Sequence, residues 1–196
     1  MPDDTLSTRR TLTLGLGAAA ATAALGAGPA RAQAGDTYSE EEIVNAASRF
    51  FGVAAELVAQ AVRPVFRDLG QPVGYVEGSE GSGAIGVGLR YGEGRLHFQR
   101  GADAPKVFWQ GPSIGFDTGA NASKVFTLVY GMTDPRQIYR RFPGVEGSAY
   151  FIGGIGVNYQ RAEGITLAPM RAGVGLRLGA NLGYLAYSPR RNYLPF

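Results

Sequence analysis

Residues 106–131 read KVFWQGPSIGFDTGANASKVFTLVYG, and this stretch decides the fold class. Its outer runs, 106–110 and 124–130, are rich in Val, Phe, Trp and Tyr, which favour pleated, half-buried strands. Between them glycine recurs every four residues, and a residue without a Cβ lets backbone or a ligand approach closely. We therefore expect β-structure around a closely packed interior, with Trp109, the only tryptophan, at the start of the segment.

Short β-type runs continue on both sides of this stretch, separated by turns that contain Gly, Asp or Pro. Eight or nine short strands at such spacing are typical of an antiparallel barrel or sandwich, and closure into a barrel removes exposed edges. Asp134 and Pro135 predict a brief helix, with Ile138 and Phe142 facing inward. The predicted strands are 73–77, 84–91, 95–100, 106–110, 124–130, 148–159, 165–168, 172–178 and 183–188.

Glycine pairs at alternate positions mark three of these strands, at 86–88, 154–156 and 173–175. Because alternate residues share one face of a strand, each pair leaves a flat face without side chains. Such a face indicates either that another element packs directly on the backbone, with an amphipathic helix as the natural candidate, or that a small barrel coils tightly there.

Residues 39–69 predict a helical segment before the strands. Ser39 and Glu42 form a capping box, and apolar residues follow at helical spacing. A second amphipathic run ends at Gly70, and Pro64 should bend it or begin a new helix. We expect these amphipathic helices to pack on or in the barrel, which makes the fold mainly β with N-terminal helices (α+β).

Composition limits the class of protein. A chain of 196 residues suits one domain with its own core, and charged residues make up 18% against a typical share of about 25%. The net charge of +3, from 19 basic and 16 acidic residues, is too small and too scattered to predict nucleic acid or an acidic membrane as a partner. Cysteine is absent, so disulfides reveal nothing about the compartment.

The first 34 residues predict a cleaved secretory signal. Arg9 and Arg10 precede an Ala/Leu/Gly-rich run at 12–28, and residues 30–34 hold two overlapping A-x-A sites. The paired arginines favour the twin-arginine route, whereas Thr13 leaves the general secretory route open. A run of about 17 residues interrupted by Gly and Thr makes a poor bilayer span. We expect export to the periplasm with cleavage near Ala34, which leaves 35–196 as a single domain without a transmembrane helix.

Catalytic and cofactor motifs are weak throughout. Residues 81–86 match G-x-G-x-x-G, but the following residues read as a strand, whereas a dinucleotide site needs a helix there. His97 is the only histidine, which excludes a two-histidine metal site, and a triad with Ser113 or Ser148 would lack the G-x-S-x-G elbow. We expect no enzyme activity, no cofactor and no metal.

Four carboxylates keep one enzymatic alternative open. They lie beside Gly-rich β segments where a cleft could form, and paired carboxylates hydrolyse glycosidic bonds. A peptidoglycan-active or other envelope hydrolase therefore stays a minor hypothesis. These carboxylates are Glu77, Glu80, Asp117 and Glu146.

Six motifs are spread over the chain after residue 35: YSEEEI at 38–43, FFG at 50–52, GLRYGEG at 88–94, WQGPSIGFD at 109–117, RFPGVEGSAY at 141–150 and GVGLRLGAN at 173–181. Together they resemble one bacterial family, EipA, whose members are periplasmic envelope integrity proteins long classed as a domain of unknown function. The resemblance implies a small soluble β-barrel-like domain with a polar cavity, needed for a sound cell envelope, and it implies no particular reaction or ligand.

Residues 106–159 also resemble, more weakly, the SYLF lipid-binding domain, through a tryptophan, a Pro-Ser step and Gly-spaced strands. The chain departs from that pattern at 116–118, where SYLF proteins continue in small residues. This resemblance implies a lipid site with basic head-group contacts. In the alternative, the aromatic residues belong to the core and the arginines to solvent. The candidates are Arg90, Lys124, Arg171 and Arg177 as head-group contacts, Trp109, Tyr150 and Tyr159 as the wall, and Ser113 and Asp117 from the central segment.

The sequence therefore predicts a soluble periplasmic protein that maintains the envelope by binding an envelope lipid or glycan in a barrel cavity. An outer-membrane barrel is the alternative from another class, because the chain ends in Phe196. Against this alternative, Pro195 would interrupt the last strand, and several strands are shorter than the length of about 9–11 residues that a membrane strand needs.

Overall fold

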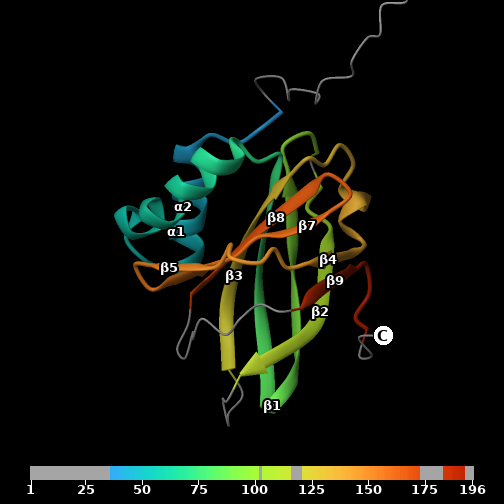
Figure 1. Cartoon of the computed structure of the whole chain (residues 1–196). Coiled ribbons are helices and arrows are strands. Elements are labelled where there is room, and N and C mark those ends of the chain that lie inside the picture. Colours follow the sequence, from blue (N-terminus) through green and yellow to red (C-terminus); the bar gives the residue numbers. More distant parts are fainter. Residues whose placement is uncertain (1–35, 102, 116–120, 173–182, 193–196) are drawn as a thin grey trace, which may run out of the picture. The chain divides into compact units, whose positions relative to one another are not determined.

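The computed structural model describes residues 36–101, 103–115, 121–172 and 183–192, without the side chains of 82–87, 113–115 and 121–122 (Figure 1). The predicted signal at 1–34 and the candidates Asp117 and Arg177 lie outside these ranges. In the described ranges two helices precede a curled antiparallel sheet, which is the predicted fold class.

The helices are α1 (Glu40–Phe51) and α2 (Ala55–Leu69). The predicted capping box is present, because the Glu42 backbone N–H donates to Ser39 Oγ (3.2 Å) and the Ser39 N–H donates to Glu42 Oε2 (2.8 Å). α2 continues through Pro64 without a break. Neither helix, nor the short 3₁₀ helix η1 (Pro135–Ile138), is long and apolar enough to cross a membrane within the described residues.

Nine strands are described, and they form one sheet in the order β4-β9-β2-β1-β3-β8-β6-β5, with β7 also paired to β8. All of the pairings are antiparallel. The strands are β1 (Gly74–Phe98), β2 (Lys106–Gly115), β3 (Asn121–Tyr130), β4 (Arg141–Pro143), β5 (Tyr150–Ile152), β6 (Ile155–Val157), β7 (Gln160–Ala162), β8 (Ile165–Ala172) and β9 (Tyr184–Ser188).

β1 folds back on itself, so its two arms lie side by side (Figure 1). Residues 74–82 pair with β3 and residues 86–95 pair with β2. A Cβ added at Gly78 would lie 2.9 Å from the Gly94 Cα, which shows how closely the arms approach. The prediction of three separate strands here was wrong. The segment 81–86 is part of β1, and strand rather than helix follows it, as predicted.

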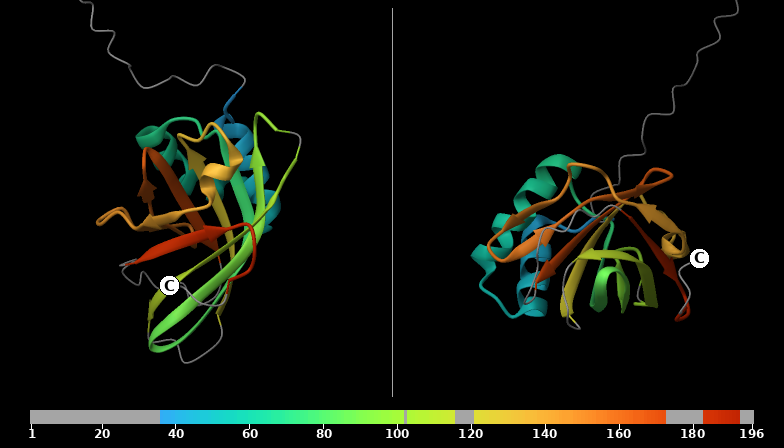
Figure 2. Two further views of the ribbon diagram at one scale, coloured as in Figure 1. Left: turned by 90° about the vertical axis from the view of Figure 1, so that its right-hand side faces the viewer. Right: turned by 60° about the horizontal axis from the view of Figure 1, so that its bottom comes forward.

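The curl of the sheet (Figure 2) brings β4, at one end of the strand order, close to β7, which pairs with β8. Beyond β4, Gly144 forms an isolated antiparallel bridge with Gln160 of β7. The Val145 N–H then donates to the Tyr159 carbonyl (2.9 Å). These contacts make the sheet barrel-like.

The two faces of the sheet separate two cores, because side chains of a strand alternate between faces. On β3, Phe126 and Leu128 belong to the core beneath the helices, whereas Val125 and Val129 belong to a second core on the opposite face. The helices therefore pack on the barrel rather than in it. We call the second face the interior. Each fully buried large side chain contributes about 1.5–3 kcal/mol of hydrophobic stabilisation.

Several strand boundaries differ from the prediction. The predicted strand 148–159 is divided into β5 and β6 by Gly153 and Gly154, whose φ values of 59° and 82° make a tight turn. β4 and β7, of three residues each, were not predicted. The brief helix is present as η1, capped by Asp134, and Ile138 and Phe142 are fully buried as expected.

Candidate binding site

Three of the predicted site residues meet in the interior around a carboxylate. Glu80 lies on the same face of β1 as Val76 and is 5% exposed. It accepts hydrogen bonds from Arg171 Nε (3.0 Å) and from Trp109 Nε1 (2.9 Å), and Arg90 Nε lies 3.3 Å from its Oε1 atom. We call Glu80, Arg90, Arg171 and Trp109 the interior cluster.

Strand pairing explains why residues far apart in the sequence meet here. The first arm of β1 supplies Glu80, the second arm supplies Arg90, and β8, beyond β3, supplies Arg171. Arg171 also donates to Asn158 Oδ1 (2.7 Å) from the connection between β6 and β7. The cluster thus ties together elements from both halves of the sheet.

Glycines of β1 make the space that the indole of Trp109 occupies. A Cβ added at Gly78 would lie 2.6 Å from Trp109 Cη2, and one at Gly92 would overlap the indole ring. Such contacts are far shorter than real Cβ contacts, so the ring lies directly on glycine backbone. Glycine backbone therefore does receive another group here, at two positions outside the predicted pairs 86–88, 154–156 and 173–175. Of those pairs, Gly154 lies in the turn between β5 and β6 and not within a strand as predicted.

Charge in the interior cluster is unbalanced. Burial acts to raise the pKa of Glu80, but the charges of Arg171 and Arg90, with hydrogen bonds from Arg171 and Trp109, outweigh burial and lower the pKa below its ordinary value. Burial lowers the pKa of Arg90, and Glu80 opposes that shift. An arginine stays protonated in proteins, so two positive charges face one negative charge. A buried net charge is costly unless a partner compensates it.

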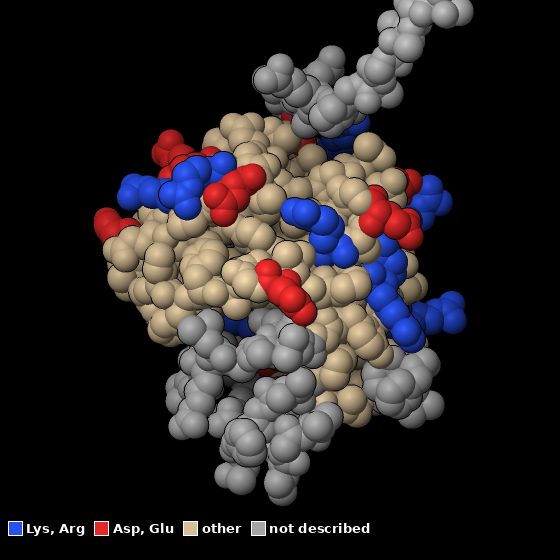
Figure 3. All heavy atoms as spheres, viewed as in Figure 1, with Lys and Arg blue, Asp and Glu red and all other residues tan. Residues whose placement is uncertain are grey.

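Surface charges are arranged differently. On the face shown in Figure 3, basic and acidic side chains lie near one another. Ion pairs nearer the surface each join one basic to one acidic residue: Arg63–Glu40, Arg67–Asp68, Arg100–Asp36, Arg136–Asp134, Arg140–Glu163 and Arg191–Glu93.

Unused hydrogen-bond donors accompany the excess charge. The Arg90 guanidinium makes an ion pair with Glu80 but no hydrogen bond within the described residues, and its Nε atom is buried. The Nδ2 atom of Asn158, a residue only 2% exposed, is likewise buried without a partner there. Buried polar groups are normally paired, so each such atom indicates a partner that the described residues do not supply. The side chain of Arg90 is 17% exposed, against 8% for Arg171.

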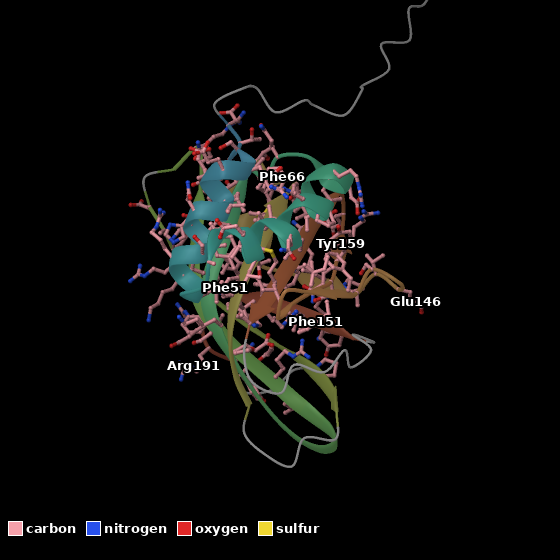
Figure 4. All side chains as sticks on the ribbon, turned by 90° about the vertical axis from the view of Figure 1, so that its left-hand side faces the viewer. Phe51, Phe66, Glu146, Phe151, Tyr159 and Arg191 are labelled. Carbon is pink, nitrogen blue, oxygen red and sulfur yellow. The ribbon has the colours of Figure 1, made fainter. Side chains whose placement is uncertain are left out.

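The other described candidates lie on the helix side of the sheet. Lys124 Nζ donates to the carbonyl of Phe50 (2.8 Å), at the end of α1, where a positive charge is favourable. The Tyr150 hydroxyl donates to the Ala61 carbonyl (2.9 Å) of α2. The Tyr159 hydroxyl donates to Asp68 Oδ2 (3.1 Å), and burial, with that bond, raises the pKa of Tyr159 to about 12 (Figure 4).

Ser113 lies within β2, and its side chain is not described. The structure therefore brings Trp109, Arg90 and Arg171 together and places Lys124, Tyr150 and Tyr159 away from them. Asn158 was not predicted. Its only sequence signal is a polar residue that directly follows the apolar pattern of β6, and turns produce the same signal.

The carboxylates considered for hydrolysis do not gather in the described part of the chain. Glu77 lies 3.6 Å from His97 Nε2, on the face opposite Glu80, and Glu146 is exposed near the turn before β5 (Figure 4). Within the described ranges, no three acidic or histidine side chains are placed to hold a metal ion.

Comparison with known proteins places the chain in a family. No curated protein matches it. A crystal structure of a β-barrel-like, uncharacterized protein from Brucella abortus is similar, with 47% sequence identity and a TM-score of 0.74, covering 82% of this chain and 99% of that chain. The family model described as EipA, envelope integrity protein A, matches residues 36–196. As its motifs predicted, the chain belongs to the EipA family.

Proposed function

We propose that this protein acts in the periplasm as a non-enzymatic factor for envelope integrity, and that it binds an anionic group of an envelope lipid or glycan at Arg90. Membership of the envelope integrity family supports the envelope role. The observation that carries the binding role is that Arg90, largely buried, forms no hydrogen bond within the described residues and belongs to a cluster with excess positive charge.

Charge balance supports an anionic ligand. Glu80 with Arg171 alone would form a balanced buried pair, in which Trp109 also donates to the carboxylate and Asn158 also accepts from the guanidinium. Arg90 adds a second positive charge, and its burial costs free energy that an anion would offset. A phosphate or carboxylate can accept two parallel hydrogen bonds from one guanidinium.

Access supports Arg90 as the contact residue. It is the most exposed of the three charged side chains of the cluster, at 17% against 8% for Arg171 and 5% for Glu80. In this arrangement Arg171 holds Glu80 in place, and Arg90 keeps its remaining donors for the ligand. The lipid and glycan hypotheses share this chemistry, since a lipid head group and an acidic glycan both present phosphate or carboxylate oxygens.

Native mass spectrometry of the exported protein, purified from the periplasm of its own bacterium, tests the proposal. We expect an additional bound mass that contains phosphate or carboxylate, and acyl chains or sugar in the extracted molecule distinguish the two sources. Arg90→Gln should remove this mass. Arg63→Gln, which changes an arginine that is 69% exposed on α2, should retain it and serves as the matched control.

Circular dichroism and the emission of Trp109 would establish that both variants fold. A wild-type protein without bound mass would contradict the proposal and indicate that the barrel serves as a docking platform for another protein. Retention of the mass by Arg90→Gln would also contradict it, because the ligand would then lie elsewhere.

A further inference from the structure

A partly enclosed cavity of about 350 Å³ lies beside β1, β2 and β9, separate from the charged centre of the interior cluster. Tyr91, Phe108 and Ser188 line it, and along their strands these residues alternate with Gly92, Trp109 and Tyr187. Because Trp109 and Tyr187 belong to the interior core, the alternate residues face the outside of the sheet. We call this cavity the outer pocket.

Aromatic surface forms much of the outer pocket. Tyr91 and Phe108 are half-buried, and the Arg191 guanidinium lies over the Phe108 ring, 5.8 Å from its centroid. Trp109 also reaches the pocket, and its position is fixed by the hydrogen bond to Glu80 and by the glycine backbone beneath it. Rigid aromatic walls lower the ordering cost of binding.

Neutral polar groups supply the rest of the pocket. Gln110, only 6% exposed, lines it together with hydroxyl and amide side chains from Ser79, Ser188 and Asn192. Among the described residues that line it, the charged ones are Glu93 and Arg191, and they form an ion pair (Arg191 is labelled in Figure 4). These described lining residues therefore carry no excess charge, in contrast to the interior cluster.

This combination matches one class of ligand. A sugar ring has apolar C–H faces and a rim of hydroxyl groups that both donate and accept hydrogen bonds. Aromatic side chains can pack against the C–H faces, and amide, hydroxyl and carboxylate groups can form hydrogen bonds with the sugar hydroxyl groups. A lipid tail would offer these amide and hydroxyl groups no hydrogen bonds, and a strongly anionic ligand would meet no unbalanced positive charge among the described lining residues.

We propose that the outer pocket binds an uncharged sugar unit of a glycan, with the ring placed against Phe108 and its hydroxyl groups on Gln110 and Ser188. This site is additional to the anion site at Arg90 and does not depend on it. The chain would thereby hold two binding sites of different chemistry on opposite faces of one sheet.

Trp109 gives a direct test, because it is the only tryptophan and it borders the outer pocket. The full chain is titrated with chitotetraose, maltotetraose and neutral glycan fragments released from the envelope of its own bacterium, up to about 10 mM, while indole emission is followed. We expect a saturable change with at least one probe. Phe108→Ala should weaken that affinity about tenfold or more, consistent with loss of an aromatic contact.

Two control variants distinguish the outer pocket from the rest of the molecule. Phe151→Ala removes an aromatic residue that is 45% exposed on β5, and it should leave sugar affinity unchanged. Arg63→Gln, at an arginine that is 69% exposed on α2, should also leave it unchanged. If Phe108→Ala fails to fold, Ser188→Ala with Asn192→Ala provides the milder variant.

Absence of a saturable change with all three probes would overturn the proposal. Equal affinity in the folded Phe108→Ala protein, or in the milder variant where that is used, would overturn it too. Loss of sugar binding in Arg90→Gln with retention in Phe108→Ala would show that the sugar binds at the interior cluster and not in the outer pocket.

Discussion

Polar side chains on the two faces of the sheet differ in how fully they are hydrogen-bonded. On the helix side, Lys124, Tyr150 and Tyr159 each donate to an acceptor on α1 or α2, and they join the helices to the barrel. In the interior, Glu80 has three partners, whereas Arg90 has an ion pair and no hydrogen bond within the described residues. The helix side also leaves a neutral group, the Tyr130 hydroxyl, buried without a partner among the described residues. The comparison teaches that polar groups on the helix side join the helices to the barrel, whereas the interior holds a buried charge whose donors the described residues do not use.

The largest expected effect comes from removing the carboxylate that organises the interior. Glu80→Gln would leave the buried charges of Arg90 and Arg171 without an anion, and loss of one partner of a buried ion pair costs about 3–5 kcal/mol. Urea unfolding should show this loss in the free energy of unfolding. Glu40→Gln, which breaks an exposed pair with Arg63, should cost less than about 1 kcal/mol. Equal losses would show that the interior is no more dependent on charge than the surface.

Acid should reproduce part of that effect. The folded-state pKa of Glu80 is lowered, so its contribution to stability is fully present above the unfolded-state pKa of about 4.3 and disappears as the pH falls through the folded-state value. The stability difference between wild type and Glu80→Gln should therefore be constant near neutral pH and shrink below about pH 4.3. Unfolding midpoints in urea over a pH series measure it. A difference that grew on acidification would contradict the charge assignment.

The fit between Trp109 and glycine should be nearly as sensitive. Gly92→Ala would place a methyl group within the indole ring, and overpacking costs about 1–3 kcal/mol. We expect lower stability and a shifted emission of Trp109, measured by denaturation followed through fluorescence. At Gly81 an added Cβ meets nothing within 4 Å, so Gly81→Ala is the matched control and should change both quantities little. Similar behaviour of the two variants would show that the ring is not held against the backbone.

The smallest expected effect lies on the helix side. Ser39→Ala removes the cap of α1 and should cost about 1 kcal/mol. Because this cap does not touch the interior cluster, the bound mass and the emission of Trp109 should stay as in the wild type. Thermal unfolding measures the cost, and Gln60→Ala, at an exposed position of α2, serves as control. A changed ligand occupancy would show that the two faces are coupled.

The sequence predicted the helices, their cap and the β-rich class correctly, because these features depend on local spacing. It could not tell which strand face is the interior, since Phe126 and Val125 are both apolar and both buried. For that reason Lys124, which precedes Val125 on β3, was grouped with Arg90 and Trp109 although it lies on the opposite face. Whether Ser113, Asp117 and Arg177 act in binding stays a prediction.

Long-range pairing also escaped prediction. β4 and β7 have three residues each, too few for a periodic signal, and they form strands only because their partners are in place. The predicted strands 165–168 and 172–178 left out residues 169–171, yet β8 runs through them and through Pro169. That proline lies where the partner of β8 changes from β6 to β7, a position at which a missing N–H is tolerated.

Because few backbone contacts connect β4 to β7, the strand pairing is weaker at this seam than elsewhere around the barrel. At this seam, one bridge at Gly144 and the neighbouring hydrogen bond from Val145 connect the end of β4 to the start of β7. Elsewhere in the sheet, β1 pairs with β2 over ten residue pairs and with β3 over nine. Local opening occurs where few hydrogen bonds must break at once. We therefore expect this seam to open locally at a lower free energy than unfolding of the whole sheet. Amide hydrogens there should exchange with solvent faster than those of β3. A ligand could then reach the interior through this seam while the rest of the sheet stays folded.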